Sequence, residues 1–589
     1  MASMKFTKEQ EAAIYTRDAN LLVAAAAGSG KTAVLVERII KMITDKDRPI
    51  DIDRLLVVTF TNAAASEMRE RIGKAISNEI SKNPTSIYLQ RQLTLLNKAS
   101  ITTIHSFCLD VIKRNFHMID LDPNFRIADE TETLILKQES LDEVFEEMYE
   151  EKDEYFLKLV ESYCNNKNDL SLFEMVLDLY NFSMSNPYPE KWLNEKSELL
   201  NIEKSDYLNS ESIIEMLKID IKTKISEAFN NINDAKEIVD RTESLLKYQS
   251  VIDCDFFFSQ NIKDNSNDLD KIRDLFLKLE FKKMPTISKC PDAELQKYVK
   301  KNRDNYKALM NEIKENIEKI YSNSNYDDLE YIYPLIKKLC ELVIKLRDRY
   351  SEKKKEKAII DFNDFEHFAL KILTEEVDGK IVPSKVAEVL REGYDEILID
   401  EYQDSNYIQE YILNMISKKH IGINNIFMVG DVKQSIYRFR MAKPELFLNK
   451  KETYSLEEGK ETRLIKLYKN FRSRKVIIDS VNYVFRNIMS KELGELDYNK
   501  EEELNLGADY KEIESGTCGG PTEVILINKD ELLEEVEEGD DEEPLSSIEL
   551  EAKVVGKRIL DLIDEKNQFK VFDNDLKDYR NVKYKDIVV

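Results

Sequence analysis

One short stretch near the amino terminus constrains the fold more than any other part of the sequence. Residues 21–32 read Leu-Leu-Val-Ala-Ala-Ala-Ala-Gly-Ser-Gly-Lys-Thr, and a helical pattern of apolar residues follows. The apolar run is long enough for one buried strand, and small residues let successive backbone N–H groups close around phosphates at the start of a helix. Lys31 would reach the terminal phosphates, and the Thr32 hydroxyl can ligate Mg²⁺. The sequence therefore predicts a phosphate-binding loop formed by Ala25, Ala26, Ala27, Gly28, Ser29, Gly30, Lys31 and Thr32.

Alternating strand and helix patterns surround this loop. Buried strands are expected at 55–61, near 100–107, at 396–400 and at 425–431, and a further strand from Leu464 leads into a helix near Val476–Phe485. Such alternation predicts an α/β fold with a parallel sheet. In such a sheet the ligand-binding loops follow the carboxyl ends of the strands.

The pattern divides the chain into three parts. Residues 1–115 and 358–460 are predicted to form the first α/β domain, which is discontinuous in sequence. Residues 116–357 have apolar residues at helical spacing, which predicts a large all-helical insertion. Residues 461–589 are expected to begin a second α/β domain and to be truncated before its end. Within them, residues 530–543 hold ten Asp and Glu and no Lys or Arg, which is typical of a solvated linker.

Net charge, cysteine spacing and the length of apolar runs limit which partners and cofactors the protein can have. The formal net charge is −26, yet residues 1–115 hold 17 Lys and Arg against 12 Asp and Glu, so a polyanion would have to bind a local surface. The six cysteines form no Cys-x-x-Cys pair, which favours a reduced, cytoplasmic protein without a zinc or iron–sulfur site. No apolar run approaches the roughly 18 residues that a membrane span needs, so no membrane partner is expected.

Three further sites supply what ATP hydrolysis needs beyond the phosphate loop. Asp400 follows a β-rich run and would hold Mg²⁺ through water, and Glu401 would orient or deprotonate the attacking water. Gln434 lies in a loop after the strand at 425–431, where its amide could sense the terminal phosphate. Arg472 could supply positive charge to the transition state, as an arginine finger does.

Aromatic residues gather in the loops at the strand ends rather than within the apolar strands. Stacking on such rings, with hydroxyl and basic groups on the phosphates, is how proteins hold single-stranded nucleic acid. Tyr437, Arg438, Arg440 and Phe107 belong to these loops. The candidate DNA contacts are Thr59, Phe60, Asn62, Thr103, His105 and Phe439.

Taken together, these motifs resemble the UvrD/Rep-type superfamily 1 DNA helicases. Seven segments follow the order of that family's motifs: 6–14 (Q motif), 25–32 (I), 59–71 (Ia), 102–107 (the next DNA-contact motif), 400–404 (II), 430–440 (III) and 470–473 (IV). Residues 360–365, residues 429–442 and the long insertion look most like the AddA branch, the helicase–nuclease subunits of bacterial double-strand-break repair and recombination.

The resemblance implies a P-loop RecA-like domain with a helical insertion and the start of a second RecA-like domain. It implies that Gln10 recognises adenine and that Phe471 stacks on that base. It further implies ATP and Mg²⁺ as cofactors, 3′→5′ translocation, single- and double-stranded DNA as partners, and an AddB-like subunit in a heterodimer. We find no counterpart of motif V, of motif VI or of the nuclease domain, so the chain is expected to match the amino-terminal half of the family's proteins.

Three functions are compatible with the residues. The first is an ATP-driven motor on single-stranded DNA. The second is a nucleotide-gated DNA-binding fragment without productive turnover. The third is a P-loop ATPase that acts on a partner other than nucleic acid, which leaves the aromatic loops without a purpose. DNA-stimulated ATP hydrolysis separates the first from the second, and salt-sensitive binding of single-stranded DNA counts against the third.

Overall fold

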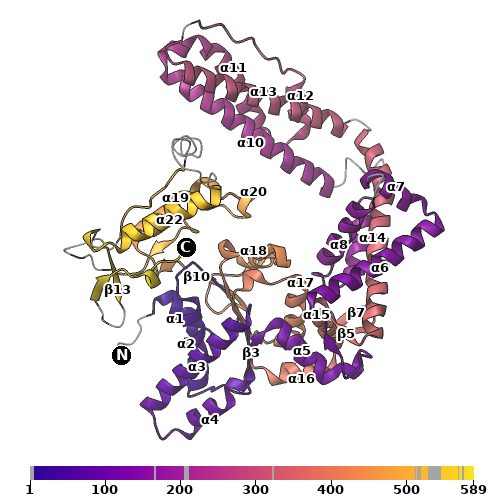
Figure 1. Ribbon diagram of the computed structural model, residues 1–589, viewed down its shortest axis with the longest axis vertical. Helices are drawn as coiled ribbons and strands as arrows, with labels where there is room; N and C mark the ends of the chain where they lie inside the picture. The colour runs from indigo at the N-terminus through magenta and orange to yellow at the C-terminus, as the bar shows by residue number, and fades with distance from the viewer. Residues whose placement is uncertain are drawn as a thin grey trace, which may run out of the picture. The chain divides into compact units, whose positions relative to one another are not determined.

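The computed structural model describes residues 6–164, 168–203, 211–288, 290–321, 324–510, 513, 519–527, 546–567, 569–573, 576 and 578–589. The chain divides into two compact units (Figure 1). The first unit contains residues 1–123 and 362–589, and the second contains residues 124–361. The second unit covers most of the segment 116–357 for which the sequence predicts a helical insertion.

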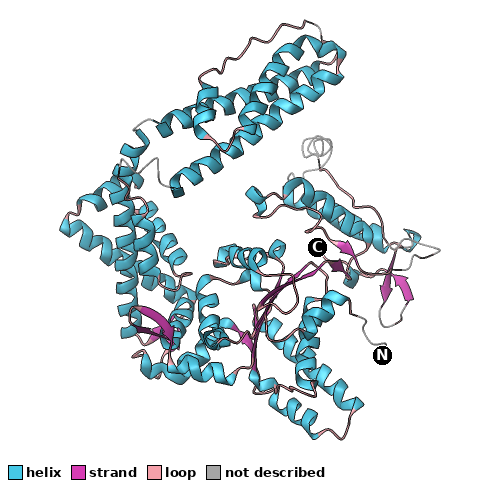
Figure 2. Cartoon of the chain, turned by 180° about the vertical axis from the view of Figure 1, so that it is seen from behind, coloured by secondary structure: helices cyan, strands magenta, loops and turns pink. Residues whose placement is uncertain are grey.

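A six-stranded sheet is the centre of the first unit, and all its pairings are parallel. Helices cover both of its faces (Figure 2). The two covered faces explain why the strands are continuous apolar runs rather than alternating ones. The strand order is β10 (Thr462–Leu467), β1 (Asn20–Ala25), β9 (Ile426–Gly430), β8 (Glu396–Ile399), β2 (Leu55–Thr59) and β3 (Ser100–Thr103).

The helices of this unit bury apolar side chains against the sheet or against one another. In the helix after the phosphate loop, Val34, Leu35 and Ile39 are fully buried and join the core with Leu21 and Val57. The predicted α/β fold with a parallel sheet is confirmed. The helices are α1 (Lys8–Tyr15), α2 (Lys31–Thr44), α3 (Asn62–Lys82), α4 (Ile87–Leu95), α5 (Ile104–Asn115), α15 (Phe362–Leu373), α16 (Lys385–Gly393), α17 (Tyr407–Ile416) and α18 (Pro444–Thr453).

The strand β10 corrects one predicted boundary. The sequence places the end of the first α/β domain at residue 460 and assigns the following strand to the second. In the structure β10 pairs with β1 along its whole length, from Asn20–Thr462 to Ala25–Leu467. The apolar pattern of a buried strand does not reveal which sheet receives it, so the boundary at 460 is wrong and the first sheet extends to residue 467.

The second unit is built almost entirely of helices. Two separate clusters of buried apolar residues hold it together, one around Leu141 and Tyr350 and one around Ile232 and Tyr306. Its only strands among the described residues are the short pair β4 (Arg126–Ile127) and β5 (Ile359–Ile360). The helices are α6 (Glu130–Glu151), α7 (Glu154–Tyr163), α8 (Leu170–Ser183), α9 (Pro189–Glu198), α10 (Glu211–Arg241), α11 (Gln249–Asp264), α12 (Leu269–Phe276), α13 (Ala293–Tyr321) and α14 (Ser324–Glu356).

The first unit has further elements outside the central sheet. Two parallel strands, β11 (Lys469–Asn470) and β12 (Asn505–Leu506), pair with each other. The predicted acidic linker at 530–543 lies outside the described residues.

No helix within the described ranges is long and apolar enough to cross a membrane. The remaining elements are β6 (Thr374–Val377), β7 (Lys380–Pro383), α19 (Lys475–Ile488), α20 (Lys491–Gly494), α22 (Ser547–Ile563), β13 (Lys570–Asp573) and β14 (Asp578–Asn581).

Candidate functional site

The loop between β1 and α2 has the backbone that a phosphate site requires. Gly28 and Gly30 have φ angles of 69° and 83°, a region that glycine occupies without strain. The Ser29 N–H donates to the Ala26 carbonyl at 3.1 Å and closes the turn. No side chain caps the amino terminus of α2 at Gly30. The orphan N–H groups and the positive end of the helix dipole therefore remain for an anion.

A second loop, far away in sequence, packs directly on this phosphate loop. The Phe471 N–H donates to the Gly28 carbonyl at 2.8 Å, and a Cβ on Gly28 would lie 2.7 Å from Asn470 Oδ1. The same oxygen accepts the N–H groups of Arg472 and Ser473, each at 2.8 Å. Asn470 thus fixes the turn that carries Phe471 and Arg472. The sequence reasoning missed this role, for which an Asn at the start of a turn is the available signal.

The predicted adenine-binding residues lie in one pocket beside the loop. Gln10 closes a capping box with Thr7 at the start of α1, and its Nε2 donates to the Ser29 carbonyl at 2.9 Å. Tyr468 was not predicted, yet its ring lines the same pocket. The lining residues are Thr7, Glu9, Gln10, Ser29, Leu467, Tyr468, Lys469 and Phe471.

The paired carboxylates follow β8 and face the phosphate loop. Lys31 Nζ lies 2.5 Å from Glu401 Oε2. Burial and the neighbouring Glu401 carboxylate raise the pKa of Asp400 to about 6, and the same two causes raise the pKa of Asp404 to about 7. The charges of Asp400 and Asp404 are therefore influenced by the same two neighbours, Glu401 and Lys31.

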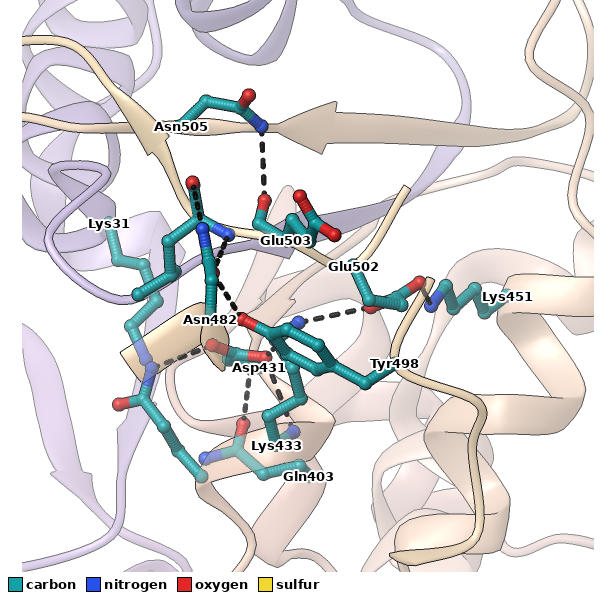
Figure 3. A network of polar contacts seen from close by, with 12 residues as sticks. Lys31, Gln403, Asp431, Lys433, Lys451, Asn482, Tyr498, Glu502, Glu503 and Asn505 are labelled. Atoms are coloured by element: carbon teal, nitrogen blue, oxygen red, sulfur yellow. Dashed lines mark hydrogen bonds and ion pairs between the residues drawn. The ribbon is translucent and has the colours of Figure 1, made fainter. Parts of the chain in front are cut away.

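A chain of hydrogen bonds joins these carboxylates to the loop after β9, and Figure 3 shows its members Gln403 and Asp431. Gln403 Nε2 donates to Glu401 Oε2 at 3.0 Å, and Gln403 Oε1 accepts the Asp431 N–H at 3.0 Å. Asp431 Oδ2 accepts Gln434 Nε2 at 2.8 Å. Gly430 is required here because a Cβ at that position would overlap with Gln403 Oε1. The structure thus brings Lys31, Glu401 and Gln434 into one network, and Gln403 and Asp431 are its unpredicted members.

The residues proposed for Mg²⁺ are chemically suited to it. A hydroxyl in the first turn of α2, from Thr32, and a carboxylate at the end of β8, from Asp400, are oxygen donors, which Mg²⁺ prefers. The Asp404 Oδ1 atom is buried and has no hydrogen-bond partner among the described residues. No group of three or more His, Cys, Asp or Glu able to hold a metal occurs in the described part of the chain. The donor set fits an ion that keeps water and phosphate ligands.

Phe60, from the loop after β2, meets the loop that follows Gln434. Its ring lies 4.3 Å from the ring of Tyr437, and Tyr437 lies 5.8 Å from Phe439. The Arg440 guanidinium stands 5.3 to 5.7 Å from all three ring centres. Phe439 is 73% exposed. A surface of stacked rings with one cation therefore faces solvent at the carboxyl-terminal edge of the sheet.

Two of the predicted DNA contacts have buried side chains in the structure. Thr59 is 2% exposed and donates its hydroxyl to the Thr61 carbonyl at 3.1 Å. Thr103 is 7% exposed, and its hydroxyl caps α5 by accepting the Ser106 N–H at 3.3 Å. Both hydroxyls satisfy groups of the neighbouring turns, as hydroxyls at strand ends can do, and contact of these two residues with DNA stays a prediction.

The other predicted contacts remain accessible. Asn62 is exposed at the start of α3, next to Thr103 across the β2–β3 pairing. His105 is 44% exposed, and its Nε2 lies 3.5 Å from the buried carboxylate of Glu366. Arg472 is exposed in the turn after β11. The hydrogen bond from its backbone N–H to Asn470 fixes the position of its backbone but not that of its guanidinium.

Comparison with known proteins agrees with the resemblance found in the sequence motifs. The family model described as UvrD/REP helicase N-terminal domain matches residues 6–455. A relative from Clostridium acetobutylicum, named as the A subunit of an ATP-dependent helicase/nuclease, is 50% identical over 99% of this chain and 48% of the relative. Proteins of the same name from Clostridium beijerinckii and Clostridium novyi are 48% and 50% identical, each over 100% of this chain and 48% of the relative. The chain therefore spans about half the length of these relatives.

Proposed function

Because the chain belongs to the UvrD/REP helicase family, we propose that it binds and hydrolyses ATP to move along single-stranded DNA in the 3′→5′ direction. Its relatives are named as parts of an ATP-dependent helicase/nuclease. We extend that name to this chain as a proposal, with an AddB-like protein as its partner and double-strand-break repair as its setting.

One observation carries the proposal. A single edge of one parallel sheet presents the phosphate loop after β1, the carboxylates after β8 and the exposed aromatic cluster of the loops after β2 and β9. The loop after β9 contains both Gln434 and Phe439, separated by five positions. A change in the position of Gln434 on hydrolysis would therefore be transmitted over a short distance to the DNA-contacting rings.

Each residue of the candidate site has a separate role in the proposed binding and hydrolysis of ATP. Lys31 and the N–H groups of the phosphate loop hold the phosphates, and Gln10 and Phe471 hold the base. Mg²⁺, held by Thr32 and Asp400, would neutralise charge on the phosphate oxygens. Glu401 orients the attacking water and accepts its proton. Its ion pair with Lys31 belongs to the nucleotide-free chain, and bound phosphates would draw the Lys31 ammonium away from this carboxylate.

The alternative proposal is a DNA-binding fragment that ATP gates without productive turnover. This alternative requires the Lys31–Glu401 pair, 2.5 Å apart, to persist when ATP binds, so that the proposed base stays paired with the phosphate-binding lysine. Hydrolysis measured with and without single-stranded DNA separates the proposals. Turnover that DNA stimulates supports the motor, and ATP-dependent DNA affinity without turnover supports the fragment.

We expect Lys31→Ala to weaken ATP binding by about 10- to 100-fold, because hydrogen bonds from a charged group contribute roughly 1.5–3 kcal/mol. Equilibrium titration with a fluorescent ATP analogue measures this. Lys46→Ala, at an exposed lysine just after α2, serves as the control and should leave the affinity unchanged. Equal affinities for the two variants would contradict the proposed phosphate site.

We expect Phe439→Ala to weaken single-stranded DNA binding by about tenfold, since base–aromatic stacking contributes roughly 1–3 kcal/mol per base. Fluorescence anisotropy of labelled oligothymidine at two salt concentrations is the measurement. The matched variant Tyr15→Ala removes a ring that is 58% exposed just before β1, at the opposite edge of the sheet. A loss of affinity shared by both variants would speak against a specific role of the aromatic cluster.

A further inference from the structure

Residues 498–507, here called the bracing segment, are fixed to α19 by one buried amide. Asn482 Oδ1 accepts the Tyr498 hydroxyl at 2.7 Å and the Leu504 N–H at 3.0 Å. Asn482 Nδ2 donates to the Leu504 carbonyl at 3.0 Å, and the side chain is 5% exposed. Because all the groups that this amide binds lie on one stretch of chain, the bracing segment has a defined conformation (Figure 3).

The same segment is anchored beside the phosphate loop. Its β12 strand pairs with β11, and the Gly507 N–H donates to the Asn470 carbonyl at 2.8 Å. Between its two anchors it carries three consecutive glutamates, and each pairs with a different part of the first unit. Glu501 lies 2.8 Å from Lys466 of β10, and Glu503 lies 2.6 Å from Arg486 of α19.

Glu502 is the one member of this triplet whose contacts lead into the candidate site. Its Oε2 lies 3.0 Å from Lys433 Nζ, and its Oε1 pairs with Lys451 of α18. Burial alone would raise the pKa of Glu502, but Lys433 and Lys451 hold it below the ordinary value. The Glu502 side chain is 12% exposed, so its charge acts in a poorly solvated environment where ion pairs are strong.

Lys433 also contacts Asp431. Its Nζ lies 2.9 Å from Asp431 Oδ1, which also accepts the Lys433 N–H at 3.2 Å. The other oxygen of Asp431 holds the amide of Gln434. Asp431 is 3% exposed, so the position of its carboxylate depends on these partners and on the Gln403 contact to its N–H.

We propose that Glu502 is a positioning residue for Gln434: it holds Lys433, Lys433 orients the Asp431 carboxylate, and that carboxylate fixes the Gln434 amide. The inference rests on the proposed function and on the role predicted from the sequence for Gln434, whose amide would sense the terminal phosphate of ATP. It connects discrimination between ATP and ADP to the bracing segment and, through Asn482, to α19.

The test is a comparison of ADP with a non-hydrolysable β,γ-imido ATP analogue, both with Mg²⁺, by titration calorimetry on the 589-residue chain. We expect Glu502→Gln to reduce the preference for the analogue over ADP by about tenfold, as Gln434→Ala does, with ADP affinity changed by less than about twofold. The double variant should be no worse than Gln434→Ala alone, because both residues act in one pathway. Glu501→Gln, at a side chain that is 69% exposed, is the control and should change neither affinity.

Several results would overturn the inference. They are an unchanged preference in Glu502→Gln, an effect that adds to that of Gln434→Ala, an equal loss of both affinities, and a wild-type chain that does not prefer the analogue. Failure of the proposed function looks different. In that case ADP does not bind, or Lys31→Ala binds both nucleotides as well as the unaltered chain, and the inference falls with it.

Discussion

Replacing Glu401 by Gln should slow ATP hydrolysis by about 100- to 10,000-fold, the range that a positioned general base contributes. The amide keeps the size of the side chain and can still accept the hydrogen bond from Gln403 Nε2, but it cannot accept a proton from water. ATP affinity should stay within a few-fold, because Lys31 and the phosphate loop hold the nucleotide. Single-turnover hydrolysis with single-stranded DNA present, next to equilibrium ATP binding, measures the two quantities separately.

The control for this variant is Glu392→Gln, an isosteric change at an exposed carboxylate at the end of α16. It should hydrolyse ATP at the rate of the unaltered chain. A reduction of less than about tenfold in Glu401→Gln, or a parallel loss of ATP affinity, would show that Glu401 is not the base. If neither the unaltered chain nor Glu392→Gln hydrolyses ATP, the result supports the gated DNA-binding fragment instead.

Replacing Arg38 by Met should lower the free energy of unfolding of the first unit by about 3–5 kcal/mol, the cost of breaking a buried ion pair. Arg38 is 1% exposed, and its Nη2 lies 2.6 Å from Glu396 Oε1 at the start of β8. Its Nη1 donates to the carbonyls of Ala13 and Thr16, each at 2.8 Å. The variant leaves a carboxylate and two carbonyls without their donor. Urea unfolding followed by hydrogen exchange in peptides 31–44 and 396–399 is the measurement.

Two further variants isolate the cause. Arg38→Met combined with Glu396→Gln should recover part of the lost free energy of unfolding, because neither position then carries a buried charge. The recovery should be partial because Arg17, whose Nη1 lies 3.7 Å from Glu396, also loses a charged partner. Arg48→Met breaks a pair of similar length, 2.8 Å to Asp18, but the two side chains are 69% and 64% exposed. It should cost no more than about 1 kcal/mol. An equal cost for Arg38→Met and Arg48→Met would refute the argument from burial.

The residues that the sequence identified lie within contiguous motifs. The phosphate loop, the Asp400–Glu401 pair and Gln10 are each recognisable from a short run of residues, because strand, loop and helix follow one another directly there. Their local geometry depends on small residues and caps that are adjacent along the chain. For the same reason the strands β1, β2, β8 and β9 were predicted close to their observed positions.

The sequence left the environment of a side chain open where that side chain can have two uses. A threonine at a strand end can face a ligand or satisfy a backbone group, and the pattern of residues is the same in both cases. Thr59 and Thr103 take the second role, and burial alone distinguishes the two. Phe60 and Phe439 are aromatic residues of the same cluster, and one contributes a partly covered ring while the other is exposed.

By itself, then, the sequence determined the family, the parallel α/β fold and the motifs that we propose to bind phosphate, because these depend on residues adjacent along the chain. Only the tertiary structure decided that β10 joins the first sheet, that Asn470 packs on Gly28 and that Glu502 reaches Lys433. The physical reason is the same in each case. Hydrophobic periodicity says that a segment is buried, whereas its partner, often hundreds of residues away, is chosen by packing and by the pairing of buried polar groups.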